Sequence, residues 1–144
     1  MQIPTKNDWG KISAIDIERQ YAFDMFIDKS IAQALDMCKL HSHGYQEELQ
    51  SMPKVPFNFY APVLANYIIS PSAKGDSDGA NAFLDMVAWM LETQRSLINP
   101  DTETLLTSAA KQVSENQDFY EASLDIYGSF RDKYLTISEI LKRV

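Results

Sequence analysis

Residues 80–91 read ANAFLDMVAWML, and ten of these twelve residues are apolar. The two polar residues, Asn81 and Asp85, are four positions apart, so in a helix they share one narrow line. A helix that is apolar around most of its circumference is buried by its neighbours. The run is too short to span a bilayer, which takes about 20 apolar residues. We therefore predict an all-α protein in which residues 79–97 form a buried central helix.

Five further segments place apolar residues at helical spacing between capping and breaking residues. They cover residues 13–26, 30–41, 58–69, 99–113 and 126–142. Pro62 is tolerated only in the first turn of a helix or at a kink, so the start of its helix is expected near residue 58 or 60. Residues 116–125 are polar with embedded aromatics and are expected to form a loop or a short turn. The predicted architecture is a compact, irregular bundle of about six helices.

Capping residues define the expected helix ends. Ser13 and Ser30 are the expected N-caps of the first two helices, and Gly44 is suited to the residue that follows the second helix. Residues 45–50 are expected to form another helical turn before the two prolines, Pro53 and Pro56. Either Ser77 or Asp78 is expected to cap the central helix, because a short polar side chain at that position accepts a backbone N–H.

A chain of 144 residues has the size of one domain, so residues 1–144 are expected to form a single helical domain. Residues 1–12 are expected to be an extended lead-in, with Trp9 as an anchor onto the body. Cys38 is the only cysteine, which excludes an internal disulfide bond and fits a reducing compartment. The first residues contain no apolar signal segment, so we expect a cytoplasmic protein.

The net charge of −7 is unevenly distributed along the chain. Residues 1–75 balance to −1 and residues 126–144 to +2, whereas residues 76–125 carry ten Asp or Glu against two Lys or Arg, a balance of −8. Such an acidic segment repels nucleic-acid phosphates and attracts cationic proteins. We therefore expect a basic protein partner, no nucleic acid and no membrane. The simpler alternative is a well-hydrated surface with no partner.

The residues expected to bind the partner are carboxylates and one aromatic pair of the acidic segment: Asp76, Asp78, Glu115, Asp118, Phe119, Tyr120, Glu121 and Asp125. Phe119 and Tyr120 are expected to be an exposed contact point, because tyrosine is favoured at interfaces. The predicted function is a non-enzymatic protein-binding module. In its narrower form it is an immunity protein that neutralises a cationic toxin by steric and electrostatic occlusion.

One grouping favours a different class of function, a small helical enzyme or a metal- or ligand-binding domain. Cys38, His41 and His43 are residue types that bind zinc, but a zinc site takes three or four ligands and a carboxylate would have to complete this one. The alternative is a buried core thiol followed by two solvated histidines. No catalytic residue, metal or cofactor is predicted. A homo-oligomeric structural protein is the third alternative.

Two carboxylate positions have structural explanations. Asp76 and Asp78 resemble the start of a calcium-binding loop, but Asn81 and Val87 occupy positions where that loop requires glycine and glutamate, so we expect a capped helix start. Asp85 must either face solvent along the line that it shares with Asn81 or meet a partner, because burying an unpaired carboxylate is costly.

Overall fold

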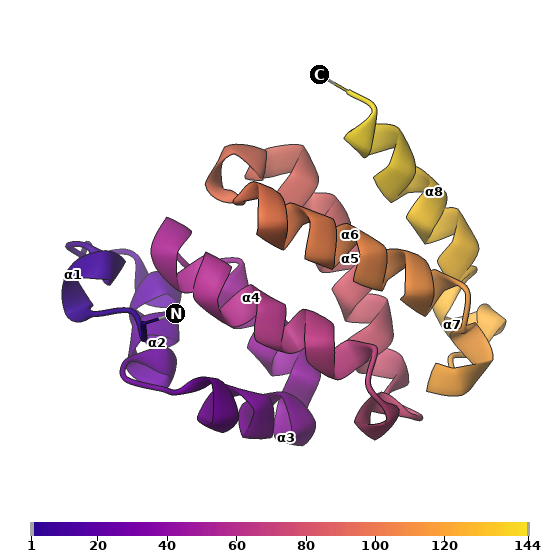
Figure 1. Ribbon diagram of the computed structural model, residues 1–144, viewed down its shortest axis with the longest axis horizontal. Helices are drawn as coiled ribbons and strands as arrows, with labels where there is room; N and C mark the ends of the chain where they lie inside the picture. Colours follow the sequence, from indigo (N-terminus) through magenta and orange to yellow (C-terminus); the bar gives the residue numbers. More distant parts are fainter. Residues whose placement is uncertain (1, 144) are drawn as a thin grey trace.

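The computed structural model describes residues 2–143, and every regular element among them is helical. Six helices have ten or more residues: α2 (Ile17–Phe26), α3 (Ile31–Leu49), α4 (Lys54–Ile68), α5 (Ser77–Thr93), α6 (Pro100–Ser114) and α8 (Phe130–Leu141). Shorter elements complete the chain: α1 (Lys6–Trp9), η1 (Pro71–Ala73), η2 (Arg95–Leu97), η3 (Gln117–Tyr120) and α7 (Leu124–Tyr127). The prediction of an all-α bundle is confirmed (Figure 1).

Two helices form the centre of the bundle. α5, the predicted central helix, packs against α3, α6 and α8, while α4 packs between α3 and α6 (Figure 1). α5 buries nine of its seventeen residues, and α4 buries eleven of its fifteen. α5 ends at Thr93, before the predicted residue 97, because Gln94 leaves the helical conformation (φ −134°, ψ 24°) and a 3₁₀ turn follows.

The expected break near His41 is confirmed, because α3 (Ile31–Leu49) consists of two helices that meet at a non-helical residue there, and the expected further turn at Tyr45–Gln50 belongs to the second of them. The expectation that Gly44 follows the end of the first helix is wrong. The backbone is kinked at His41 (φ −158°, ψ 76°), and the second half still buries residues such as Tyr45 and Leu49 against the core. Gly44 lies inside the helix, where an added Cβ would come within 2.3 Å of His41 Nδ1. The sequence therefore predicted the position of the break, and the residues after it form a second helical segment whose apolar face packs on the core.

The predicted start of the next helix near residue 58 is also wrong. α4 begins at Lys54 after Pro53, and Pro56 lies in its first turn, where no backbone N–H is needed. Pro62 consequently lies inside the helix, so it cannot donate to the carbonyl of Asn58 four residues earlier. The apolar packing of α4, with eleven buried residues, outweighs that lost bond.

Both ends of the chain differ from the expected pattern. The lead-in is not fully extended, since it contains α1, but Trp9 is the expected anchor: it is 2% exposed and stacks on Phe23 with ring centroids 5.6 Å apart. The first long helix is capped by Asp16, which accepts the Arg19 N–H, and not by Ser13. The expected last helix is divided into α7 and α8 by Gly128, whose φ of 75° favours glycine.

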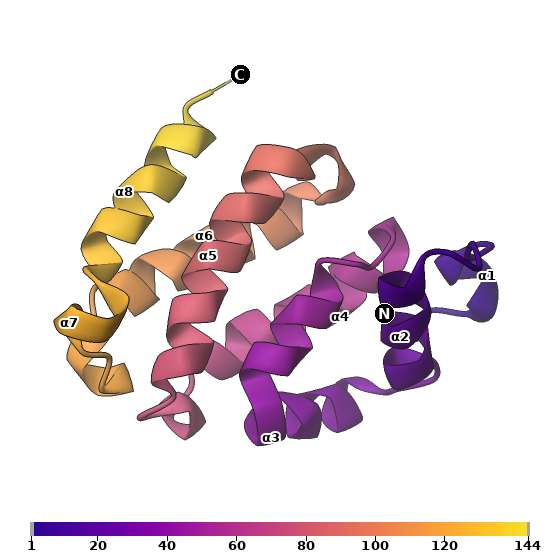
Figure 2. The same ribbon diagram turned by 180° about the vertical axis from the view of Figure 1, so that it is seen from behind.

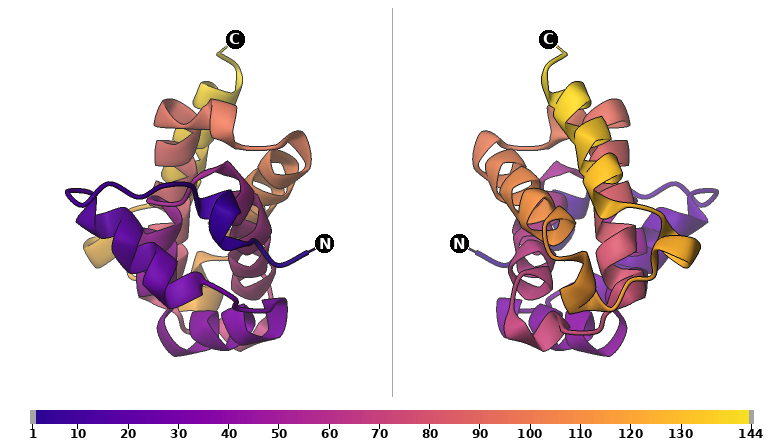
Figure 3. Two further views of the ribbon diagram at one scale, coloured as in Figure 1. Left: turned by 90° about the vertical axis from the view of Figure 1, so that its left-hand side faces the viewer. Right: turned by 90° about the vertical axis from the view of Figure 1, so that its right-hand side faces the viewer.

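The bundle presents α2, the second half of α3, and α5 on one face, with α4 and α6 behind them (Figure 2). Seen from its ends, it has α2 and α6 on opposite sides (Figure 3). Among residues 2–143, no helix combines the length and apolarity that a membrane crossing requires.

We predict that Asn58→Ala destabilises the protein by about 2–4 kcal/mol. The Asn58 side chain is 6% exposed, donates to the carbonyls of Lys54 (2.8 Å) and Leu97 (2.9 Å), and accepts the N–H of Asn99 (2.9 Å). Its loss leaves the Leu97 carbonyl and the Asn99 N–H unpaired where α4 meets the α5–α6 connection. Urea unfolding measures the change, and Asn116→Ala, at an exposed asparagine, is expected to cost under about 0.5 kcal/mol. Equal effects of the two substitutions would contradict the prediction.

Candidate partner-binding surface

Asp76 holds the start of α5 and ties it to two other helices. Its Oδ1 accepts the backbone N–H of Gly79 (3.0 Å), which makes Asp76 the N-cap. Its Oδ2 accepts the hydroxyls of Ser42 on α3 (2.5 Å) and Tyr67 on α4 (2.8 Å). The expectation that Ser77 or Asp78 caps this helix is wrong. Asp76 was predicted to bind the partner, but it is half-buried and both of its carboxylate oxygens form hydrogen bonds within the fold.

Tyr120 is not the exposed contact point that the sequence suggested. It is 1% exposed, and its hydroxyl donates to the carbonyl of Ile68 (2.6 Å). Burial, and then the nearby charge of Asp76, raises the pKa of Tyr120 to about 12. Phe119 is half-buried against the core. The pair lies in a polar segment, but the 3₁₀ turn η3 directs Tyr120 inward and uses it to attach this segment to α4.

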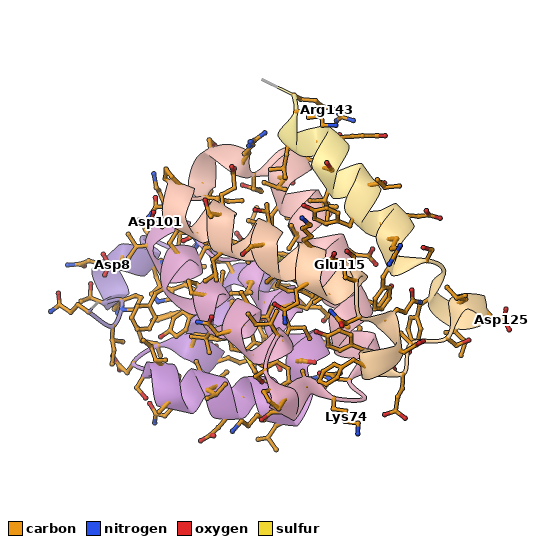
Figure 4. All side chains as sticks on the ribbon, turned by 45° about the vertical axis from the view of Figure 1, so that its right-hand side comes forward. Asp8, Lys74, Asp101, Glu115, Asp125 and Arg143 are labelled. Atoms are coloured by element: carbon orange, nitrogen blue, oxygen red, sulfur yellow. The ribbon has the colours of Figure 1, made fainter. Side chains whose placement is uncertain are left out.

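The remaining predicted carboxylates lie exposed at one end of the molecule, and we call them the acidic end: Asp78, Glu115, Asp118, Glu121 and Asp125. Backbone and side-chain bonds hold their segments together. Gly75 N–H donates to the Phe119 carbonyl (3.0 Å), and the Tyr127 hydroxyl donates to Asp78 and lies 3.1 Å from that of Ser77. Figure 4 shows Asp125 projecting from α7, at the end opposite Asp8.

Ion pairs divide the acidic segment into a neutralised part and an unpaired part. Lys133 and Arg143, from the basic C-terminal segment, lie 2.8 Å from Asp85 and Glu92 of α5. Arg95 lies 2.9 Å from Glu103. In contrast, no ion pair within residues 2–143 involves a carboxylate of the acidic end. Within the described residues, exposed carboxylates such as Asp36, Asp101 and Glu139 are also without an ion pair, so the acidic end is distinguished by its grouping of five such residues.

Apolar side chains lie beside these charges. Leu124 is 66% exposed and Ile126 75% exposed, both on the short helix α7. Leu124 also lines a hollow of about 460 Å³ together with Asp118 and Asp125. Apolar area inside a charged rim is the usual anatomy of a protein–protein interface.

The structure does not bring Cys38, His41 and His43 together as one site. Cys38 is fully buried, and burial raises the pKa of its thiol to about 12, so it remains protonated at neutral pH. His41 and His43 are exposed, and His43 Nε2 lies 3.3 Å from Glu47 Oε1. Within residues 2–143, no three His, Cys, Asp or Glu side chains are grouped to hold a metal ion.

A second surface was not found from the sequence. Three adjoining hollows of about 320, 480 and 350 Å³ run beside the second half of α3, and we call them the α3 groove. Tyr21 and Glu48 line the first two hollows, and Trp89 lines the last two. Tyr21 is 57% exposed and Trp89 is 41% exposed. The sequence does carry a signal for this surface, because Trp89 lies on the same helical line as Asn81 and Asp85, the line for which exposure to solvent is predicted.

Carboxylates in the α3 groove repel one another. Burial, and then the charges of Glu47 and Glu18, raises the pKa of Glu48 above its ordinary value. All three glutamates line the hollow between Tyr21 and Trp89. A cation bound there would relieve the repulsion.

Comparison with known proteins supplies no relative, since no family model, curated protein or solved structure matches this chain.

We predict that Asp76→Ala lowers the free energy of unfolding by about 2–3 kcal/mol, because it removes a helix cap and leaves the Ser42 and Tyr67 hydroxyls without their acceptor. Thermal or urea unfolding measures this loss. Asp118→Ala removes an exposed carboxylate of the acidic end and is expected to change stability by less than about 0.5 kcal/mol. A comparable loss in both variants would contradict the distinct role of Asp76.

We predict that Glu48→Gln stabilises the protein at pH 7 by a few tenths of a kcal/mol, an effect limited by solvent screening of this partly exposed group. The folded-state pKa of Glu48 is raised, so ionisation penalises the folded state as the pH rises through and above the ordinary glutamate pKa. The advantage of Gln should therefore disappear near pH 4. Urea unfolding at both pH values tests this, with Glu139→Gln on α8 as the exposed control. If Glu48→Gln still stabilised the protein at pH 4, the effect would come from packing and the electrostatic explanation would be wrong.

Proposed function

We propose that this protein is a non-enzymatic protein-binding module whose acidic end docks a basic partner. The observation that carries the proposal is the grouping of five exposed carboxylates at the acidic end, none of which has an ion-pair partner within residues 2–143. Neighbouring carboxylates of the same segment are paired with Arg95, Lys133 and Arg143. The unpaired charges remain available to attract a cationic surface.

The mechanism combines electrostatic steering with contact through apolar side chains. Unpaired carboxylates raise the rate of encounter with a basic protein, and this effect weakens as salt screens the charges over about 10 Å at 0.1 M. Exposed Leu124 and Ile126 supply apolar area that binding can remove from water. Asp78 is common to the acidic end and the α3 groove, so a partner centred on the acidic end can extend along that groove.

The narrower form of the proposal is an immunity protein that blocks the cationic active site of a toxin. A small acidic helical protein suits this role because occlusion needs only shape and charge complementarity, without catalysis. This narrower proposal has a separate requirement. The partner must be an enzyme, and adding this protein in stoichiometric amount must abolish the enzyme's activity.

We predict that the triple variant Asp118→Asn, Glu121→Gln, Asp125→Asn associates with the partner about tenfold more slowly than the wild type at low salt. The partner is captured from native lysate on the immobilised protein, identified, purified, and measured by stopped-flow or surface plasmon resonance between 50 and 500 mM NaCl. Wild-type association should slow steeply with salt, and that of the triple variant only weakly.

The matched control is Asp36→Asn, Asp101→Asn, Glu139→Gln, which removes the same charge from exposed positions elsewhere. It should retain most of the wild-type rate. Equal slowing in both variants would show that net charge alone matters. A wild-type rate that is independent of salt would refute the electrostatic mechanism.

A further inference from the structure

α3 bends at His41, and α2 lies beside the bent helix (Figure 2). The first hollow of the α3 groove, of about 320 Å³, lies between the two helices. Tyr21 and Met25 line it from α2, Met37 lines it from the first half of α3, and Tyr45 lines it from the second half. Three helical segments therefore form the walls of one space.

The first hollow has a mainly apolar lining. Met25 and Met37 are half-buried in it, and Leu40, which also lines it, is 86% exposed. Ile17 is 76% exposed and lines the adjoining second hollow of about 480 Å³. Methionine side chains are flexible and adapt to the shape of a bound partner. Binding an apolar surface here removes exposed apolar area from water, which is favourable.

Carboxylates lie where the two hollows meet. Glu47 and Glu48 line both hollows, and Glu18 lines the second. Within the described residues, no Lys or Arg lines either hollow, and neither Glu18 nor Glu48 forms an ion pair. His43 Nε2 lies 3.3 Å from Glu47 Oε1 and pairs with it only when protonated. The groove is therefore complementary to a partner with an apolar face and a cationic edge.

The shape of the groove favours a helical partner. Among residues 2–143 every regular element is a helix, so the groove offers no strand edge to which an extended peptide adds by backbone hydrogen bonds. An amphipathic helix instead inserts side chains from positions i, i+3 or i+4 and i+7, over about 10 Å of its length. Two adjoining hollows accept such a row of side chains. Lysine or arginine side chains beside the row then reach the carboxylates.

We propose that the first two hollows of the α3 groove bind an amphipathic helix with a basic edge from another protein. The apolar side chains of that helix contact Met25, Met37 and Leu40, and its Lys or Arg side chains contact the glutamates of the second hollow. Neither hollow contains a residue of the acidic end, so this is a second docking surface and goes beyond the proposed function. The same glutamates repel anionic lipids, which disfavours a membrane as the occupant.

The probe is the fluorescein-labelled peptide LKKLLKLLKKLLKL, whose leucines form one face of a helix and whose lysines flank it. Titration with the full-length protein, followed by fluorescence anisotropy, should give a dissociation constant on the order of 10 µM. The peptide LEELLELLEELLEL keeps the apolar face and reverses the charge. The peptide LKLKLKLKLKLKLK keeps the lysines without an apolar helical face. Each should bind at least about tenfold more weakly.

Methionine signals locate the bound peptide. In protein labelled with ¹³C at the methionine methyl groups, the signals of Met25 and Met37 should shift on addition of LKKLLKLLKKLLKL, because both side chains line the first hollow. Met86 and Met90 are buried in the core and should not shift. Binding that leaves the Met25 and Met37 signals unchanged would overturn the site.

Leu40→Ser tests the apolar contact. Because Leu40 is exposed, the substitution should leave the melting temperature unchanged while weakening peptide binding about fivefold. Leu135→Ser, the same change at an exposed leucine on α8, should leave the dissociation constant unchanged. Equal effects of the two variants would show that the peptide does not use the groove.

A triple variant tests the charge contact. Glu18→Gln, Glu47→Gln, Glu48→Gln should weaken peptide binding about tenfold at low salt. The matched control removes the same charge from exposed positions on α6 and α8, and should retain most of the affinity: Asp101→Asn, Asp132→Asn, Glu139→Gln. Equal weakening by both triple variants would assign the effect to net charge and overturn the basic edge.

Further outcomes separate the other occupants. Self-association of the protein that Leu40→Ser abolishes would assign the groove to a second copy of this chain. Binding to phosphatidylcholine vesicles that Leu40→Ser abolishes would assign it to a membrane. Loss of peptide binding in Asp118→Asn, Glu121→Gln, Asp125→Asn would place the peptide at the acidic end. Each result would overturn this proposal, whereas a salt-independent association at the acidic end would refute the proposed function and leave peptide binding at the groove unchanged.

Discussion

The Asp76 carboxylate is the constraint on which the arrangement of the bundle depends. One oxygen caps α5, and the other accepts hydroxyls from α3 and α4, so a single side chain joins three helices. A helix cap normally bonds only to the first turn of its own helix, whereas Asp76 also bonds to side chains of α3 and α4. α3 and α5, which these bonds join, both line the α3 groove.

The fold redistributes charge that the sequence presents as one continuous acidic segment. α8 lies against α5 and carries Lys133 to Asp85, and Arg143, just beyond its end, meets Glu92. Exposed pairs of this kind contribute little to stability, about 0–1 kcal/mol each. Their larger effect is on the surface potential, because they neutralise the middle of α5 and leave the unpaired carboxylates around η3 and α7.

The sequence predicted elements whose signals are local and failed where tertiary packing prevailed. The apolar run around Phe83 correctly gave the central helix, and Ser30 caps α3 through the Gln33 N–H as expected. Pro62 was misleading as a boundary because the buried face of α4 continues past it, whereas the break expected near His41 is present as a kink within α3. In an irregular segment the sequence has no periodicity that would predict which side chains point into the core. For that reason the sequence did not predict that Tyr120 is buried.

Cys38 gives this chain an internal reporter of its own opening. Its sulfur is enclosed between α3 and the core and holds its proton at neutral pH, so thiol reagents and oxidants have no access to a thiolate in the closed molecule. Alkylation requires that α3 separate from the core, if only briefly. The rate at which this single thiol is labelled therefore measures how often α3, which lines the α3 groove, separates from the core.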